Sequence, residues 1–303
     1  MSTLISASGL TKHYGPKLAL NNVSFEINKG APVALVGPNG AGKTTLFSLL
    51  CGYIFPSAGS LSILGNTAGN SRLFGQLAAL PQDSQLDPRF SSLHQLTFYG
   101  QLQGFSRAKA KQESLRVLEL VGLSDVANQH PTDLSHGMRK RVSIAQALFG
   151  EPQIVMLDEA TAGLDPIHAR EVRELVSALS SVTTFILSSH DLSELERLCG
   201  QVLHLDQGLL TEHSVERGAR ATNNNHFITL QLTQQYQGIE PILQKLQNVS
   251  HVYMSQAKEY VIEYTASAQA FDIQLLKCCH EHGWQYRQLI NGNTLENQIF
   301  HKE

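Results

Sequence analysis

The sequence predicts an α/β protein with a parallel sheet, an inserted helical region and a second, smaller α+β domain. Two short apolar runs, at 32–36 and 154–157, have the length and near-continuous hydrophobicity of strands that are covered on both faces. A third apolar run, at 184–187, follows a helical pattern at 167–179, and this alternation of strand and helix is typical of a parallel sheet. The 303 residues are enough for two domains of ordinary size.

The other elements follow in chain order. Apolar residues recur every three or four positions through 93–123, so we expect a helical subdomain, at about 85–150, between the two halves of the sheet. Residues 211–226 are polar and rich in asparagine, which predicts a linker. Residues 227–303 are expected to form an accessory βαββαβ unit of the ferredoxin-like type. Its two helices would cover one face of its sheet and leave the opposite face open for pairing or docking.

Composition limits the possible functions. The formal net charge is −3, the pI is about 6.5, and the longest basic run is 139–141, so we expect no nucleic-acid partner. The four cysteines lack the spacing of a metal site and are expected to be reduced thiols. The first twelve residues do not read as a secretory signal, and no uncharged apolar stretch approaches about 18 residues, so we expect no membrane span.

A glycine-rich segment carries the first chemical signal. Residues 37–44 match the P-loop pattern G-x-x-x-x-G-K-[ST], with a predicted strand before them and a helical run at 45–50 after them. Glycine lets the backbone N–H groups close around phosphate oxygens, and the following helix N-terminus favours an anion. A glycine-rich turn without a ligand is the alternative, and the eight matched positions argue against it. The expected nucleotide contacts are Gly37, Pro38, Asn39, Gly40, Ala41, Gly42, Lys43, Thr44 and Thr45.

Four side chains are expected to do the chemistry beside this loop. Lys43 would reach the β- and γ-phosphates and assist catalysis, and the Thr44 hydroxyl would ligate Mg²⁺. Asp158 and Glu159 end the second apolar run, at the edge of the sheet where such loops lie. Asp158 would hold the Mg²⁺ shell and Glu159 would polarise the attacking water. Two acids at the end of a strand usually belong to a solvated loop. Together with a P-loop, however, they are better explained as part of a phosphate-binding site.

A further set of motifs makes the resemblance specific. Residues 134–138, Leu-Ser-His-Gly-Met, precede a basic run and resemble the signature motif of ABC ATPases. With the other motifs they cover residues 1–210, which the resemblance assigns to a P-loop NTPase core with a mixed sheet. The other motifs are similar to the family's Q-loop at Gln82, its D-loop ending at Asp165, its H-loop at His190 and its adenine-stacking aromatic at Tyr14.

The resemblance implies that ATP and Mg²⁺ are bound between two subunits. Ser135 and Gly137 of one subunit would close over the γ-phosphate held by the other, and Ser135 is a suitable N-cap for the helix that would point at it. His190 would be catalytic and reach the γ-phosphate, and Gln82 would sense Mg²⁺ and contact the nucleotide, as would Asp165 and Tyr14. Taken singly, His190, Gln82 and Tyr14 also fit a structural histidine, a loop residue and a core aromatic.

The remaining segments indicate the kind of ABC protein. The signature has His136 and Met138 where the family most often has Gly and Gln, but it keeps Ser135 and Gly137, so we expect activity. Segments 91–100, 118–123 and 294–300 are similar to ATP-binding subunits of ABC-2-type exporters. This resemblance implies a homodimer that drives separately encoded transmembrane permease subunits, peripheral on the cytoplasmic face of the inner or plasma membrane.

Two alternatives stay open. One is a ribosome-associated ABC ATPase, a class that usually carries two ATPase units in one chain, and this chain has one. The other is a DNA-repair ABC ATPase, which needs a long coiled coil between its P-loop and its signature. The stretch between Lys43 and Ser135 is too short for such an arm.

Overall fold

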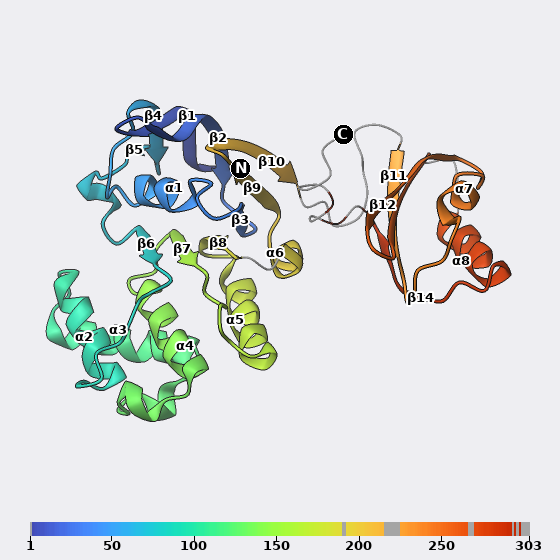
Figure 1. Cartoon of the computed structure of the whole chain (residues 1–303). Helices are drawn as coiled ribbons and strands as arrows, with labels where there is room; N and C mark the ends of the chain where they lie inside the picture. The colour runs from blue at the N-terminus through green and yellow to red at the C-terminus, as the bar shows by residue number, and fades with distance from the viewer. Residues whose placement is uncertain are drawn as a thin grey trace. The chain divides into compact units, whose positions relative to one another are not determined.

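The structure is a computed structural model that describes residues 2–189, 192–214, 225–265, 270–292, 294 and 297. The chain divides into two compact units, residues 1–214 and 215–303, and the cartoon in Figure 1 shows the elements of each.

The first unit contains two sheets. One is antiparallel, in the order β2-β1-β4-β5, and the other has six strands in the order β10-β9-β3-β8-β7-β6. Strands β3, β6, β7, β8 and β9 run parallel, whereas β10 is antiparallel to β9, which confirms the expected mixed sheet. The strands are β1 (Thr3–Tyr14), β2 (Lys17–Asn28), β3 (Val33–Val36), β4 (Ala58–Ile63), β5 (Asn66–Thr67), β6 (Leu77–Leu80), β7 (Ile154–Asp158), β8 (Thr184–Ser188), β9 (Gln201–Asp206) and β10 (Leu209–Ser214).

Helix α1 (Lys43–Leu50) lies in the main core of this unit. Its buried Leu46, Leu49 and Leu50 pack with apolar side chains from both sheets. Two further helices, α5 (Pro166–Leu179) and α6 (Leu192–Leu198), belong to the opposite face of the six-stranded sheet, as Figure 1 shows. The central strands are therefore covered on both faces, which explains their unbroken apolar sequence.

The inserted subdomain is helical, as expected. It contains α2 (Ser92–Leu102), α3 (Arg107–Leu120) and α4 (His136–Ala147), and each helix begins after a serine whose hydroxyl accepts a backbone N–H: Ser91, Ser106 and Ser135. The insert departs after β6 and returns at β7, and these two strands are paired directly in parallel. Both ends of the insert are therefore held by neighbouring strands of one sheet.

The expected start of the linker at residue 211 is wrong by four residues. Thr211–Ser214 continue β10, which pairs with β9 along its whole length. At the other end, β11 already begins at Asn225. Polar residues suit β10 because it is the edge strand of its sheet.

The second unit has the expected ferredoxin-like arrangement. Its strands are antiparallel in the order β12-β13-β11-β14, and Ile228, Leu230, Tyr260 and Ile262 form one core with residues of both helices. The elements are β11 (Asn225–Leu232), α7 (Ile239–Leu243), β12 (Val249–Gln256), β13 (Glu259–Thr265), α8 (Phe271–Glu281) and β14 (Tyr286–Asn291).

The opposite face of this second sheet is not open, which corrects the expectation from the sequence. Thr229 and Val261 alternate with the core-facing residues of β11 and β13, yet they are 1% and 0% exposed. Asn297 is also buried, and its side chain donates a hydrogen bond to Glu259 at 3.2 Å. The centre of this face is therefore already covered.

Among the described residues, no helix combines the length and the apolar character that crossing a bilayer requires.

Candidate active site

The P-loop joins β3 to α1 and is fixed by close backbone approaches. Gly37 has a φ of 150°, and a Cβ there would lie 2.0 Å from the carbonyl oxygen of Leu205. Gly42 has a φ of 114°, and its Cβ would lie 2.6 Å from the carbonyl oxygen of Ala19. Both positions therefore require glycine, because a larger residue would displace the strands that support the loop.

The loop ends in an uncapped helix N-terminus. Gly42 occupies the N-cap position of α1 and contributes no side-chain hydrogen bond, so the first N–H groups of the helix have no cap of this kind. Lys43 folds back, and its Nζ donates to the carbonyl oxygens of Gly37 at 2.6 Å and Pro38 at 3.1 Å. This combination of N–H groups and an ammonium fits a chain of phosphates.

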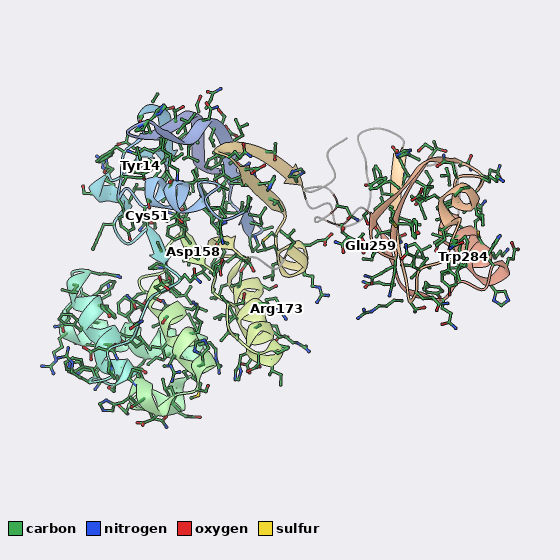
Figure 2. The ribbon with its side chains drawn as sticks, viewed as in Figure 1. Tyr14, Cys51, Asp158, Arg173, Glu259 and Trp284 are labelled. Carbon is green, nitrogen blue, oxygen red and sulfur yellow. The ribbon has the colours of Figure 1, made fainter. Side chains whose placement is uncertain are left out.

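Lys43 shares its surroundings with the two expected acids. Burial lowers the pKa of Lys43, and the negative charges of Glu159 and Asp158 act in the opposite direction. These acids are far from Lys43 in sequence, so the fold brings the three charged groups into one site. Figure 2 shows Asp158 between α1 and the helical insert.

Ser188 holds both acids in place. It is buried at the end of β8, directly opposite Asp158 at the end of β7. Its hydroxyl donates to Oδ1 of Asp158 and accepts the backbone N–H of Glu159 at 3.0 Å. Glu159 has a φ of 48°, a left-handed conformation that is uncommon outside glycine, and the same N–H also donates to the carbonyl oxygen of Ser188. Ser188 is not among the residues that the sequence predicts for this site.

A second lysine faces the same acids from the helical insert. Lys140, on α4, is partly buried, and burial lowers its pKa against the opposing effect of Asp158, Glu159 and Asp83. Asp83 follows the expected Q-loop residue Gln82, which is exposed just beyond β6. Because β6 and β7 are parallel neighbours, their carboxyl ends place both acidic segments at one edge of the sheet.

The basic run 139–141 is used within the chain. Arg139 donates to the carbonyl oxygens of Pro131 and Leu134, at 3.3 and 2.5 Å. Arg141 donates to the carbonyl oxygen of Val121 and lies 3.5 Å from a carboxylate oxygen of Glu171. Each member of the run thus has a local interaction within the first unit.

The signature residues lie at the start of α4. Ser135 is its N-cap, and its hydroxyl accepts the N–H of Met138 at 3.2 Å. Ser135 and His136 are exposed, whereas Gly137 is buried. This arrangement agrees with the N-cap that the sequence predicts.

Asp165, expected to contact nucleotide, caps α5 in this structure. Its Oδ1 accepts the N–H groups of Ile167 at 3.0 Å and His168 at 3.1 Å, and its Oδ2 lies 2.5 Å from Nδ1 of His168. The hydrogen bonds from His168 lower the pKa of the Asp165 carboxyl. The carboxylate therefore has a structural role at the helix start.

Of the last two expected residues, the structure describes Tyr14 but not His190. Tyr14 ends β1 and is 47% exposed, with Nζ of Lys12 at 5.3 Å from its ring centroid, so its ring has a free surface on which a base could stack. His190 lies outside the described residues.

The donor set fits MgATP. Thr44, Gln82 and Asp158 offer oxygen atoms, which Mg²⁺ prefers. Across the described ranges, no group of three or more His, Cys, Asp or Glu side chains forms a protein-only metal site. A Mg²⁺ ion that takes part of its coordination from phosphate oxygens and water matches this sparse set.

The sequence of the chain is similar to that of known ATP-binding proteins. The family model described as ABC transporter matches residues 20–162. The Nod factor export ATP-binding protein I of Rhizobium sp. (strain N33) is 38% identical over 208 residues, which cover 67% of this chain and 68% of that protein.

Two solved structures resemble the chain. The cbiO1 protein of Clostridium perfringens, described as part of the ABC transporter complex cbiONQ, has a TM-score of 0.65 and 26% identity, covering 71% of this chain and 90% of its own. The ATP-binding cassette MJ0796, described as a dimeric post-hydrolysis state bound to ADP and Pi, has a TM-score of 0.62 and 23% identity, covering 70% and 99%. The second likeness bears on the fold alone.

Proposed function

Because the chain belongs to the ABC transporter ATP-binding family, we propose that it is the ATP-hydrolysing subunit of an ABC exporter. It works as a head-to-tail dimer that moves separately encoded membrane subunits. The proposal rests mainly on one observation: Lys43, Asp158 and Glu159 come together beside a glycine loop that has no space for side chains at Gly37.

Each residue has a distinct part in this proposal. The P-loop N–H groups and Lys43 hold the phosphates, and Thr44, Asp158 and Gln82 hold Mg²⁺, which supplies charge neutralisation at the phosphate oxygens. Glu159 orients and polarises the water, and His190 assists at the γ-phosphate. Tyr14 stacks on adenine, and Ser135 and Gly137 complete the site of the partner subunit, which Asp165 also approaches.

The choice of an exporter rests on resemblance. The relative from Rhizobium sp. is named as an export ATP-binding protein, and the one from Clostridium perfringens as part of a transporter complex. We therefore place the chain on the cytoplasmic face of the membrane, bound to permease subunits. A non-transport ABC ATPase is the alternative function. If the protein is purified from its native cells and no polytopic membrane protein accompanies it, that result favours the alternative.

The first test removes the general base. Glu159→Gln keeps the side-chain volume and removes the basic oxygen, so ATP binding persists while hydrolysis falls by at least about a thousandfold. The same variant should accumulate as an ATP-bound dimer, detected by light scattering. Arg170→Ala, which changes an exposed side chain of α5, is the matched control. Near-normal turnover of the Glu159 variant contradicts the assignment.

The second test addresses the shared site. In a head-to-tail dimer, a subunit with Lys43→Ala and a subunit with Ser135→Arg together form one intact site, so an equal mixture recovers at most about a quarter of wild-type hydrolysis. Each variant alone should be inactive. A mixture that forms heterodimers and recovers no activity argues against shared sites.

The third test addresses the membrane partner. On α2, Phe98 is 53% exposed whereas Leu96 is fully buried, so Phe98 offers an apolar contact that can be changed without altering the core. Phe98→Glu should preserve basal ATPase activity and weaken co-purification with the permease. The exposed Lys111→Glu on α3 is the control. If recruitment and transport survive the Phe98 change, the docking surface lies elsewhere.

A further inference from the structure

The start of α4 and the start of α5 are in contact within one subunit. These segments come from different parts of the first unit, because α4 belongs to the helical insert and α5 follows β7. A Cβ built on Gly137 would lie 2.7 Å from both Cγ and Cδ2 of His168. The imidazole therefore lies directly on the Gly137 backbone, which accounts for the burial of Gly137 next to the exposed Ser135 and His136.

A second, looser approach runs in the opposite direction. Nε2 of His136 is 3.6 Å from the position that a Cβ of Gly163 would occupy, which is ordinary van der Waals distance. Each segment thus has a histidine near a glycine of the other, and the His168–Gly137 pair is the close one. Arg141 and Glu171, at 3.5 Å, join the same two helices further along.

The orientation of His168 is itself fixed. Asp165 accepts from Nδ1 of His168 through Oδ2 and caps α5 through Oδ1. An imidazole with its Nδ1 bonded to the cap of its own helix has little freedom to rotate. The signature backbone therefore rests against a ring whose orientation is restrained by its hydrogen bond to Asp165.

We propose that His168 is a positioning residue that holds signature residues 135–137 against the start of α5 of the same subunit, with His136 completing the contact. This inference rests on the proposed function, in which Ser135 and Gly137 close the partner's ATP site. A signature segment that is already fixed loses less conformational freedom when the dimer closes. His136 stands where the family most often has Gly, and in this proposal it helps to pack the signature segment against the segment before α5.

A thermal double-mutant cycle tests the contact without nucleotide. Gly137→Ala should lower the melting temperature by about 3 °C or more, because the added methyl meets the fixed ring. In a His168→Ala background the same change should cost much less, since only the Cβ of residue 168 remains, at 3.0 Å. Equal shifts in the two backgrounds overturn the contact.

A dimerisation assay tests the positioning role. With Glu159→Gln present to prevent hydrolysis, His168→Ala should raise the ATP concentration for half-maximal dimer formation by about fivefold, and Arg170→Ala should leave it unchanged. Amides of 134–138 should also exchange hydrogen faster in the nucleotide-free His168 variant. Dimer formation equal to that of the parent refutes the positioning role. Failure of the parent itself to dimerise with ATP refutes the proposed function instead.

Discussion

Ser188 provides the most specific test of how the site is built. Ser188→Ala removes the hydroxyl that donates to Asp158 and accepts from Glu159. The N–H of Glu159 keeps its bond to the carbonyl oxygen of Ser188, at 3.1 Å. The loss is therefore concentrated on the Asp158 carboxylate, which no longer has its hydroxyl donor.

The magnitude follows from the type of bond. A hydrogen bond to a charged group contributes about 1.5–3 kcal/mol, and partial exposure of Asp158 favours the lower end. A loss of about 1.4 kcal/mol in positioning the acids corresponds to a tenfold fall in turnover. No atom of the P-loop is changed, so the KM for ATP should move by less than about twofold.

Steady-state hydrolysis at several Mg²⁺ concentrations measures this effect. We expect a tenfold lower kcat with a higher Mg²⁺ requirement for Ser188→Ala. Ser188→Thr should restore both, because it keeps the hydroxyl and a cavity of about 20 Å³ beside Ser188 offers space for its methyl. Wild-type turnover by the alanine variant at limiting Mg²⁺, or equal defects in both variants, refutes the role of Ser188.

Three further outcomes are expected. Ser135→Asp should preserve the thermal stability of α4, because Asp is as good an N-cap as Ser, yet abolish ATP-driven dimerisation by repelling phosphate, whereas Ser135→Ala should cost about 1 kcal/mol of stability. Glu113→Gln should destabilise the insert by about 1–2 kcal/mol in chemical denaturation, since Glu113 binds Arg116 and the N–H of Gly150. A chain ending at Ser214 should fold and bind ATP in calorimetry, whereas one ending at Leu210 should be less stable, because it lacks most of β10.

The P-loop and the two acids near it could be located from the sequence because their signals are local. Gly37 and Gly42 belong to one contiguous motif, and Asp158 is the last residue of an apolar strand. The ferredoxin-like unit could be predicted as well, because its strands and its two helices follow one another in the order βαββαβ.

Other features depend on contacts distant in sequence. Ser188 acts on Asp158 because β7 and β8 pair in one register, and nothing in the residues themselves fixes that register. His168 covers Gly137 only because α4 and α5 meet. The pairing of β1 with β2 contains several register shifts, which interrupt the alternation by which such strands are recognised. The covered face of the second unit was missed for the same reason, because Asn297 approaches Glu259 from far along the chain.

The position of Lys43 has a consequence for ligand choice. Its ammonium donates to two carbonyl oxygens of its own loop, so the backbone of Gly37 and Pro38 acts as an internal competitor of the substrate. The lysine therefore contributes to the binding free energy of a nucleotide only the difference between its interaction with the phosphate oxygens and its interaction with the two carbonyl oxygens that they replace. Ligands with a single phosphate should gain least, and we expect the preference for ATP over AMP to shrink when Lys43→Met removes the exchange. The hydrogen bonds within the loop thus contribute to the discrimination between nucleotides with different numbers of phosphates.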